Sequence, residues 1–198
     1  AFSQSRAMEI LAEIGGERAV ETLTRVLSTR NAKQGSEAAQ LEAFKRANAA
    51  EALGRLQDAR VIEALRSAAT DERWLIRIKA SSALTKLGED DALNGVLEGL
   101  GADDSRVIGL AISELRLLKQ TQSLVNLERF IKTVTKSGGE NAPLSPAMQK
   151  NVNDAVHAVE TITKEVGGLA TQEKNQIEDL ETPATETAEA KATPKERD

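Results

Sequence analysis

Apolar positions along the chain form a repeated pair of helical stripes. Four segments, which begin at Leu11, Leu53, Leu84 and Leu115, can be laid over one another without gaps. In each copy, the apolar residues four before, at and three after the anchor leucine fall on one side of a helix. Those nine, twelve and sixteen positions after it form a second stripe. The pattern therefore predicts that each copy is a pair of helices joined by a short turn.

Small and helix-starting residues support this interpretation. Each copy has alanine four positions before the anchor leucine, where a small side chain lets neighbouring helices approach closely. Asp71 and Asp104 precede expected first helices, where a carboxylate can accept the free backbone N–H groups. A two-helix unit cannot bury both of its stripes alone, so the units must stack. We therefore expect an all-α superhelix of about four to five helical hairpins, with a weak fifth copy containing Ala155, Val159 and Ile162.

The spacing of the copies defines the domain organisation. Residues 1–166 form the expected repeat domain, with insertions near 31–41 and 136–146 where the interval between copies lengthens. Residues 167–182 could form a short capping helix. Residues 183–198 are rich in Thr, Ala, Glu and Pro, a composition too polar to pack a core, and we expect a disordered acidic tail.

Composition narrows the function classes. The chain has 198 residues, 40% of them hydrophobic but only 2% aromatic, so Leu, Ile, Val and Ala must build the core. The sequence has no Cys, which excludes disulfides, thiolate chemistry and cysteine metal sites. No apolar run approaches the roughly 20 residues of a membrane-spanning helix. Localisation stays open: the sequence slightly favours the cytoplasm, and a mature exported chain also fits.

The charge distribution opposes nucleic acid or an anionic membrane as a partner. The net charge is −5, and all of it arises from residues 136–198, because basic and acidic residues are equal in number before them. A neutral body with an acidic tail lacks the basic patch on which such binding depends.

Individual residues suggest neither a metal site nor a cofactor. His157 is the only histidine, and it occupies a column that we interpret as solvent-facing. The acidic run 89–91 could bind a divalent cation, but it opens a second helix, where carboxylates interact favourably with the helix dipole. The glycine pairs 15–16, 138–139 and 167–168 lack the lysine and hydroxyl of a phosphate loop, so we interpret them as turns.

The segment AAEALGRLQDARVIEALRSAATDERWLIRIKASSALTKLGEDDAL resembles the HEAT-repeat superfamily in its short bacterial form, the phycobilisome-lyase HEAT-like repeat. Arg46 and Arg77 stand where that form commonly has arginine, and Asp58 falls in the family's turn. The resemblance implies an α-solenoid. For these arginines we favour a structural role, in which each binds carbonyl groups or turn acids of an adjacent unit, and the alternative is a role in an interface.

The resemblance further implies a binding surface, because second helices line the concave side of HEAT-like stacks. The candidate partner-binding residues there are Arg18, Arg25, Arg60, Arg66, Asp91 and Glu98, with basic residues in the first two units and acidic ones beyond. The alternative is a solvated face of mixed charge. Trp74 is a further candidate, as an exposed anchor at the start of a first helix. Its alternative role is packing over the edge of a neighbouring unit.

Proteins of this kind are mostly scaffolds or adaptors. The sequence therefore favours a non-catalytic scaffold that binds another protein, without a cofactor, with a small molecule as an unlikely partner and with no catalytic residue. The alternative is a phycobilin lyase-like subunit that acts on the chromophore of a phycobiliprotein. A third hypothesis, nucleic-acid binding, is opposed by the neutral body and the scarcity of aromatic residues.

Overall fold

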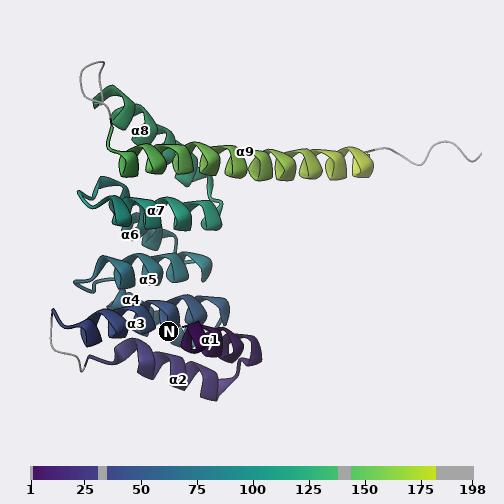
Figure 1. The fold of residues 1–198 in the computed structure, drawn as a ribbon. Coiled ribbons are helices and arrows are strands. Elements are labelled where there is room, and N and C mark those ends of the chain that lie inside the picture. Colours follow the sequence, from purple (N-terminus) through teal and green to yellow (C-terminus); the bar gives the residue numbers. More distant parts are fainter. Residues whose placement is uncertain (1, 31–34, 138–143, 182–198) are drawn as a thin grey trace, which may run out of the picture.

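A computed structural model describes residues 2–30, 35–137 and 144–181 of the chain, and every element in these ranges is a helix (Figure 1). The elements are α1 (Phe2–Ile14), α2 (Glu17–Ser28), α3 (Glu37–Arg55), η1 (Ala59–Val61), α4 (Ile62–Ala68), α5 (Trp74–Lys86), η2 (Asp90–Ala92), α6 (Leu93–Leu97), η3 (Glu98–Gly101), α7 (Ser105–Leu118), α8 (Thr121–Ser137) and α9 (Pro146–Glu181).

The helices form a stack of hairpins in two layers. The first helices of the units, α1, α3, α5, α7 and α9, follow one another along the stack, and the second helices, α2, α4, α6 and α8, form the other layer (Figure 1). We call the layer of α2, α4, α6 and α8, with η1, η2 and η3, the second-helix face. This arrangement confirms the expected all-α stack of four hairpins, with α9 as the first helix of the fifth.

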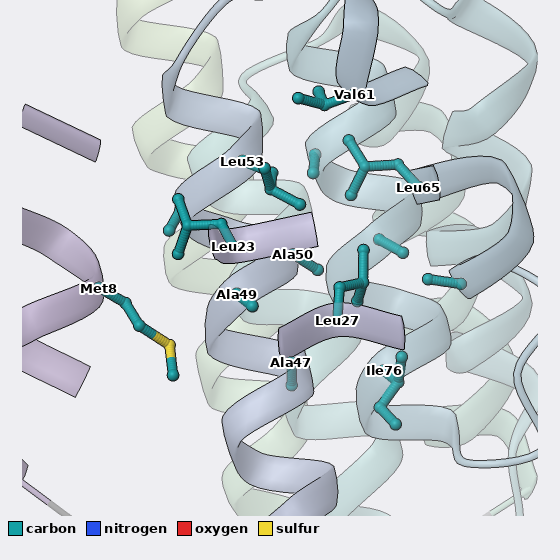
Figure 2. Packing of buried hydrophobic residues seen from close by; sticks show 14 of the residues in the cluster. Met8, Leu23, Leu27, Ala47, Ala49, Ala50, Leu53, Val61, Leu65 and Ile76 are labelled. Atoms are coloured by element: carbon teal, nitrogen blue, oxygen red, sulfur yellow. The ribbon is translucent and has the colours of Figure 1, made fainter. Parts of the chain in front are cut away.

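The predicted repeat columns are the core. The anchors Leu53, Leu84 and Leu115 are at most 3% exposed, and the apolar position twelve residues after each anchor is completely buried in all four units. Figure 2 shows Leu23, Leu53 and Leu65 gathered in the cluster that joins the first three units. A second cluster joins α5 to α9. Burial of these columns is what holds consecutive units together.

Small residues set the distance between the first helices. Ala49, Ala80 and Ala111 are completely buried, as the alanine column predicts. At Gly54 the backbones of α3 and α5 come so close that a Cβ atom there would lie 2.7 Å from the Cβ of Ala83. Only glycine fits this contact without a shift of one helix.

The first unit departs from the pattern at its outer side. Ala7 is exposed, and Ile10 and Ile14 on the same helix are 41% and 74% exposed. In the central units the equivalents of Ile10 are covered, since Ala52, Ala83 and Glu114 are at most 3% exposed. No described helix covers α1 in the same way.

The C-terminal region differs from the expected organisation. We interpreted Gly167–Gly168 as a turn before a separate capping helix, but α9 runs through both residues to Glu181. The expected turn at this pair is therefore wrong. A glycine costs a helix only about 1 kcal/mol relative to alanine, so the good helix formers on either side carry the helix through the pair. The other pairs differ: Gly15–Gly16 forms a turn with positive φ at both residues, and Gly138–Gly139 lies outside the described residues.

The ends of the two expected insertions are helical. Helix α3 already begins at Glu37, so the end of the 31–41 segment is helical, and residues 31–34 lie outside the described part. At the second insertion, α8 extends to Ser137 and α9 begins at Pro146, while residues 138–143 are not described. The expected acidic tail, 183–198, also lies outside the described residues.

Candidate partner-binding surface

The second-helix face is hollowed between α4 and α6, over the middle of α5. The cavity has a volume of about 430 Å³, and its walls include three of the residues predicted from the sequence, Arg66, Asp91 and Glu98. Asn94 completes its polar wall, and Leu84 contributes an apolar one. The structure therefore brings together residues from two consecutive units, with Asp91 and Glu98 lying 25 and 32 positions after Arg66 in the sequence.

One ion pair crosses this cavity. Nη2 of Arg66 lies 2.5 Å from Oε2 of Glu89, and the hydrogen bond raises the pKa of the Arg66 guanidinium above its usual value. Asp91 and Glu98 are exposed and form no ion pair with any described residue. Their carboxylates are therefore available to a cationic group of a partner.

Of the four cations predicted in the first two units, Arg66 lines that cavity and Arg18, Arg25 and Arg60 do not. Arg18 and Arg25 are exposed on α2, and neither is ion-paired within the described ranges. Arg60 is bound locally: its Nη2 lies 2.7 Å from Oδ2 of Asp58, and Oδ1 of the same carboxylate accepts the backbone N–H of Arg60 at the start of η1. Arg18 and Arg25 are therefore available to a partner, whereas Arg60 is already bound within its own turn.

Trp74 lies at the first turn of α5, and its indole is half-buried. It packs against the second hydrophobic cluster, which joins α5 to α9. The sequence left two roles open for Trp74, an exposed anchor and a packing residue. This arrangement agrees with the packing role. Trp74 does not line the cavity between α4 and α6.

The two arginines of the family pattern bind at the connection between α4 and α5, Arg46 from the preceding first helix and Arg77 from the helix that follows the connection. Nε of Arg46 donates to the carbonyl oxygen of Leu27 at 2.7 Å, and its Nη2 lies 2.6 Å from Oδ2 of Asp71. Nη1 of Arg77 donates to the carbonyl oxygen of Asp71 at 2.7 Å. Arg73 donates to the carbonyl oxygen of Ala39. The expected contacts with an adjacent unit are therefore confirmed for Arg46, whereas Arg77 binds carbonyl groups of Asp71 and Glu72 in the connection that leads into its own helix.

Asp71 is the acceptor on which this junction converges. Its carboxylate accepts the backbone N–H of Arg73 and also lies 3.3 Å from Nη2 of Arg30. Burial raises the pKa of Asp71, but the Arg73 N–H and the Arg46 guanidinium outweigh it and hold the pKa below its usual value. The carboxylate is therefore ionised near neutral pH and stabilises the junction of three units.

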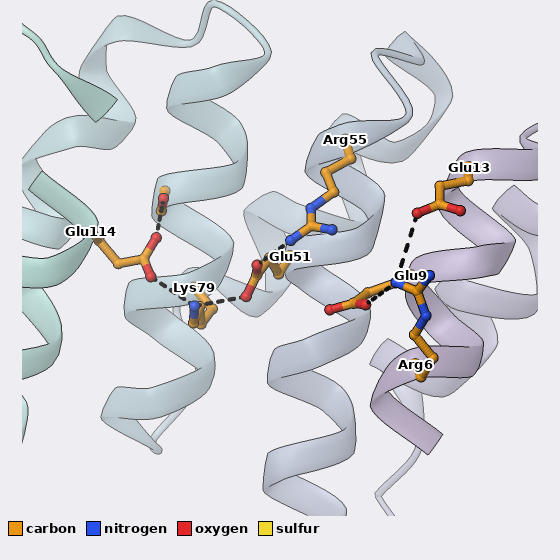
Figure 3. Close-up of polar contacts among 8 residues, drawn as sticks. Arg6, Glu9, Glu13, Glu51, Arg55, Lys79 and Glu114 are labelled. Carbon is orange, nitrogen blue, oxygen red and sulfur yellow. Dashed lines mark hydrogen bonds and ion pairs between the residues drawn. The ribbon is translucent and has the colours of Figure 1, made fainter. Parts of the chain in front are cut away.

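A second charged junction, which no pattern in the sequence predicted, lies in the first-helix layer. Nζ of Lys79 lies 2.7 Å from a carboxylate oxygen of Glu51 and 2.7 Å from one of Glu114 (Figure 3). The buried hydroxyl of Ser82 donates to the other oxygen of Glu114 at 2.7 Å. The three charges connect α3, α5 and α7.

Within this junction, the effect of ion pairing on the pKa values outweighs that of desolvation. Desolvation lowers the pKa of Lys79, but Glu114 and Glu51 outweigh it and raise the pKa. Desolvation raises the pKa of Glu51, but the hydrogen bond from Lys79 outweighs it and lowers the pKa.

Glu51 and Ser82 belong to the column that we interpreted as solvent-facing. That interpretation is wrong for these two copies, because the next first helix covers the column. It is correct for His157, whose side chain is 68% exposed.

Carboxylate side chains have structural roles at helix starts. Oδ1 of Asp104 accepts the backbone N–H of Arg106 at the start of α7, as predicted. In the acidic run 89–91, Glu89 pairs with Arg66, and the side chain of Asp90 is not described. Among the described residues, no group of three or more His, Cys, Asp or Glu is arranged to hold a metal ion.

The described helices include none that is both long and apolar enough to cross a membrane.

Comparison with known proteins agrees with the repeat architecture. The family described as HEAT repeats matches residues 42–116, and the family described as PBS lyase HEAT-like repeat matches residues 3–29. No curated protein matches the chain. The two matches cover the first three units and most of α7. The repeat columns of these units form the cores described above. The chain belongs to the HEAT-repeat superfamily and forms an α-solenoid.

Proposed function

We propose that this chain is a non-catalytic scaffold whose second-helix face binds another protein. The observation that carries the proposal is the cavity between α4 and α6, where Asp91 and Glu98 are exposed carboxylates without a described ion-pair partner. Complementary charges steer a partner and fix its orientation more than they add affinity. Arg18 and Arg25, exposed on α2 beside Glu17 and Glu21, offer cations at the other end of this face.

The stack supports such a role mechanically. Buried junctions at Asp71 and at Lys79 hold consecutive units in one arrangement. A solenoid with fixed unit geometry presents an extended surface to a partner without paying to order loops. The charges on the second-helix face can therefore be matched by an elongated partner along several units.

The titratable groups with shifted pKa values support the hypothesis that the chain is not catalytic. Perturbed groups in a cleft are candidates for catalysis, but Asp71, Glu51 and Lys79 are each held in ion pairs between helices. We assign them structural roles and propose no catalytic residue and no cofactor.

The alternative, a phycobilin lyase-like subunit, is favoured by one observation. The match to the PBS lyase HEAT-like repeat covers residues 3–29, a single unit. A bilin-binding role would require an absorbance change when a linear tetrapyrrole is added to the chain.

Affinity capture from the source organism's lysate, at low and moderate salt, tests the proposal. Mass spectrometry of the eluate should identify one stoichiometric, colourless protein. A coloured eluate with phycobiliprotein subunits would favour the lyase-like alternative. An eluate without a stoichiometric protein at either salt concentration would contradict the scaffold proposal.

A further inference from the structure

A second cavity lies at the junction of the third, fourth and fifth units. Its volume is about 340 Å³, within the range of small ligand pockets. The walls come from the end of α6, from η3, from the starts of α7 and α9, and from α8. Most of the cavity wall is apolar, with side chains from Leu100, Ile108, Phe130 and Met148. The cavity therefore suits a bulky aliphatic or aromatic side chain.

The rim of this cavity is positively charged. Arg129 lines it from α8, together with the polar Asn126 and Thr133. Lys132 and Lys136 follow Arg129 at helical spacings of three and seven residues, so the three cations form one stripe along α8. The stripe extends about 10 Å, at 1.5 Å per residue.

These cations are available to a ligand. Arg129, Lys132 and Lys136 are exposed, and none of them forms an ion pair with a described residue. No acidic side chain is among the described residues that line the cavity. Glu98 lines the neighbouring cavity, between α4 and α6. It is the first residue of η3, and the later η3 residues Leu100 and Gly101 line the cavity beside Arg129.

We propose that this cavity and the α8 stripe bind a short acidic segment of a partner protein, with one bulky apolar side chain in the cavity and carboxylates against Arg129 and Lys132. The inference rests on the proposed function and names the chemistry of the partner at one place on the second-helix face. The apolar wall accounts for the anchor side chain, and the unpaired cations account for the acidic flanks.

The probe is a pair of short synthetic peptides. One has a single Phe flanked by Glu residues at two-turn spacing, and the other has Gln in place of every Glu. Binding to the full chain is measured by fluorescence anisotropy near neutral pH. We expect the acidic peptide to bind at least about tenfold more tightly than the Gln peptide, and the difference to shrink between about 50 and 300 mM salt. Equal binding of both peptides, or binding of neither, would overturn the proposal.

Two variants separate the rim from the cavity. R129E/K132E reverses the stripe on the exposed side of α8, and Ala102→Phe fills the cavity while leaving the cations in place. We expect each to weaken binding of the acidic peptide by about tenfold or more. Lys164→Glu, on an exposed part of α9 remote from the cavity, is the charge-reversal control and should leave binding unchanged. Circular dichroism establishes that each variant is folded.

The failure of this inference can be distinguished from that of the proposed function. If a protein captured by the native chain is retained in full by both R129E/K132E and Ala102→Phe, the scaffold role stands and this site is wrong. Capture of no protein by the native chain contradicts the scaffold role itself, whereas the peptide comparison tests the site independently.

Discussion

The guanidinium of Arg46 and the carboxylate of Asp71 form a buried ion pair between two repeat units, with Nη2 and Oδ2 2.6 Å apart. Both side chains are at most 5% exposed. Arg46 simultaneously donates to the carbonyl oxygen of Leu27, at the end of the preceding second helix. One side chain therefore couples the first, second and third units.

Removing one partner of this pair should destabilise the stack strongly. Arg46→Met leaves the Asp71 carboxylate buried without its guanidinium, and we expect a loss of about 3 kcal/mol in the free energy of unfolding. Urea unfolding followed by circular dichroism measures it. R46M/D71N, which also removes the buried charge, should recover part of the loss. Arg66→Met, which breaks an exposed pair, should cost no more than about 1 kcal/mol.

The same carboxylate should make stability depend on acid pH. The pKa of Asp71 is lower in the folded chain than in the unfolded one, so its stabilising contribution is present above the unfolded value and is lost as pH falls through the folded value. We expect unfolding midpoints to fall between about pH 5 and pH 3, and to fall less steeply in D71N. Glu51 contributes in the same direction and remains in that variant. An unchanged slope in D71N would contradict the role assigned to Asp71.

The contact of α3 with α5 should not tolerate a methyl group. Gly54→Ala places a Cβ 2.7 Å from the Cβ of Ala83, and we expect a loss of about 1–3 kcal/mol although alanine favours helices. Gly101→Ala is the matched control, because nothing lies within 4 Å of its Cβ position, and it should leave stability unchanged or raise it slightly. Thermal unfolding compares the two. Equal effects would show that the helices can separate freely.

Trp74 should prove a packing residue rather than a binding anchor. Its half-buried indole packs on the second cluster, so Trp74→Ala should cost about 2–4 kcal/mol in the free energy of unfolding measured by circular dichroism. Leu117→Ala, at a side chain that is 50% exposed, is the control and should cost under about 1 kcal/mol. A Trp74→Ala variant of native stability that no longer binds its partner would support the anchor role.

The repeat columns could be predicted because burial in a solenoid is periodic. Leu53 and Ala80 occupy positions whose neighbours recur in every unit, so one pattern specifies them all. The Lys79 junction was missed because the pairing of Lys79 with Glu51 and Glu114 depends on which first helices lie next to each other, and no column requires it. The turn at Gly167 was wrong because local propensity was given too much weight against the flanking helix formers.

The candidate surface was predictable only in part. Arg66, Asp91 and Glu98 are at second-helix positions that follow from the repeat, and the structure places them around one cavity. The binding of Arg60 to Asp58 depends on the geometry of a single turn. The cavity beside Arg129 arises where η3 meets α8 and α9, an irregular junction without a repeating pattern.

Binding of the captured partner to a variant of the second-helix face tests the scaffold account most directly. D91K/E98K reverses the two exposed carboxylates beside the cavity between α4 and α6, and E13K/D103K makes the same charge change at exposed residues outside that cavity. With purified partner, the account predicts that D91K/E98K weakens binding by at least about fivefold and that E13K/D103K binds as the native chain does. Full binding by D91K/E98K, or equal loss in both variants, would contradict it.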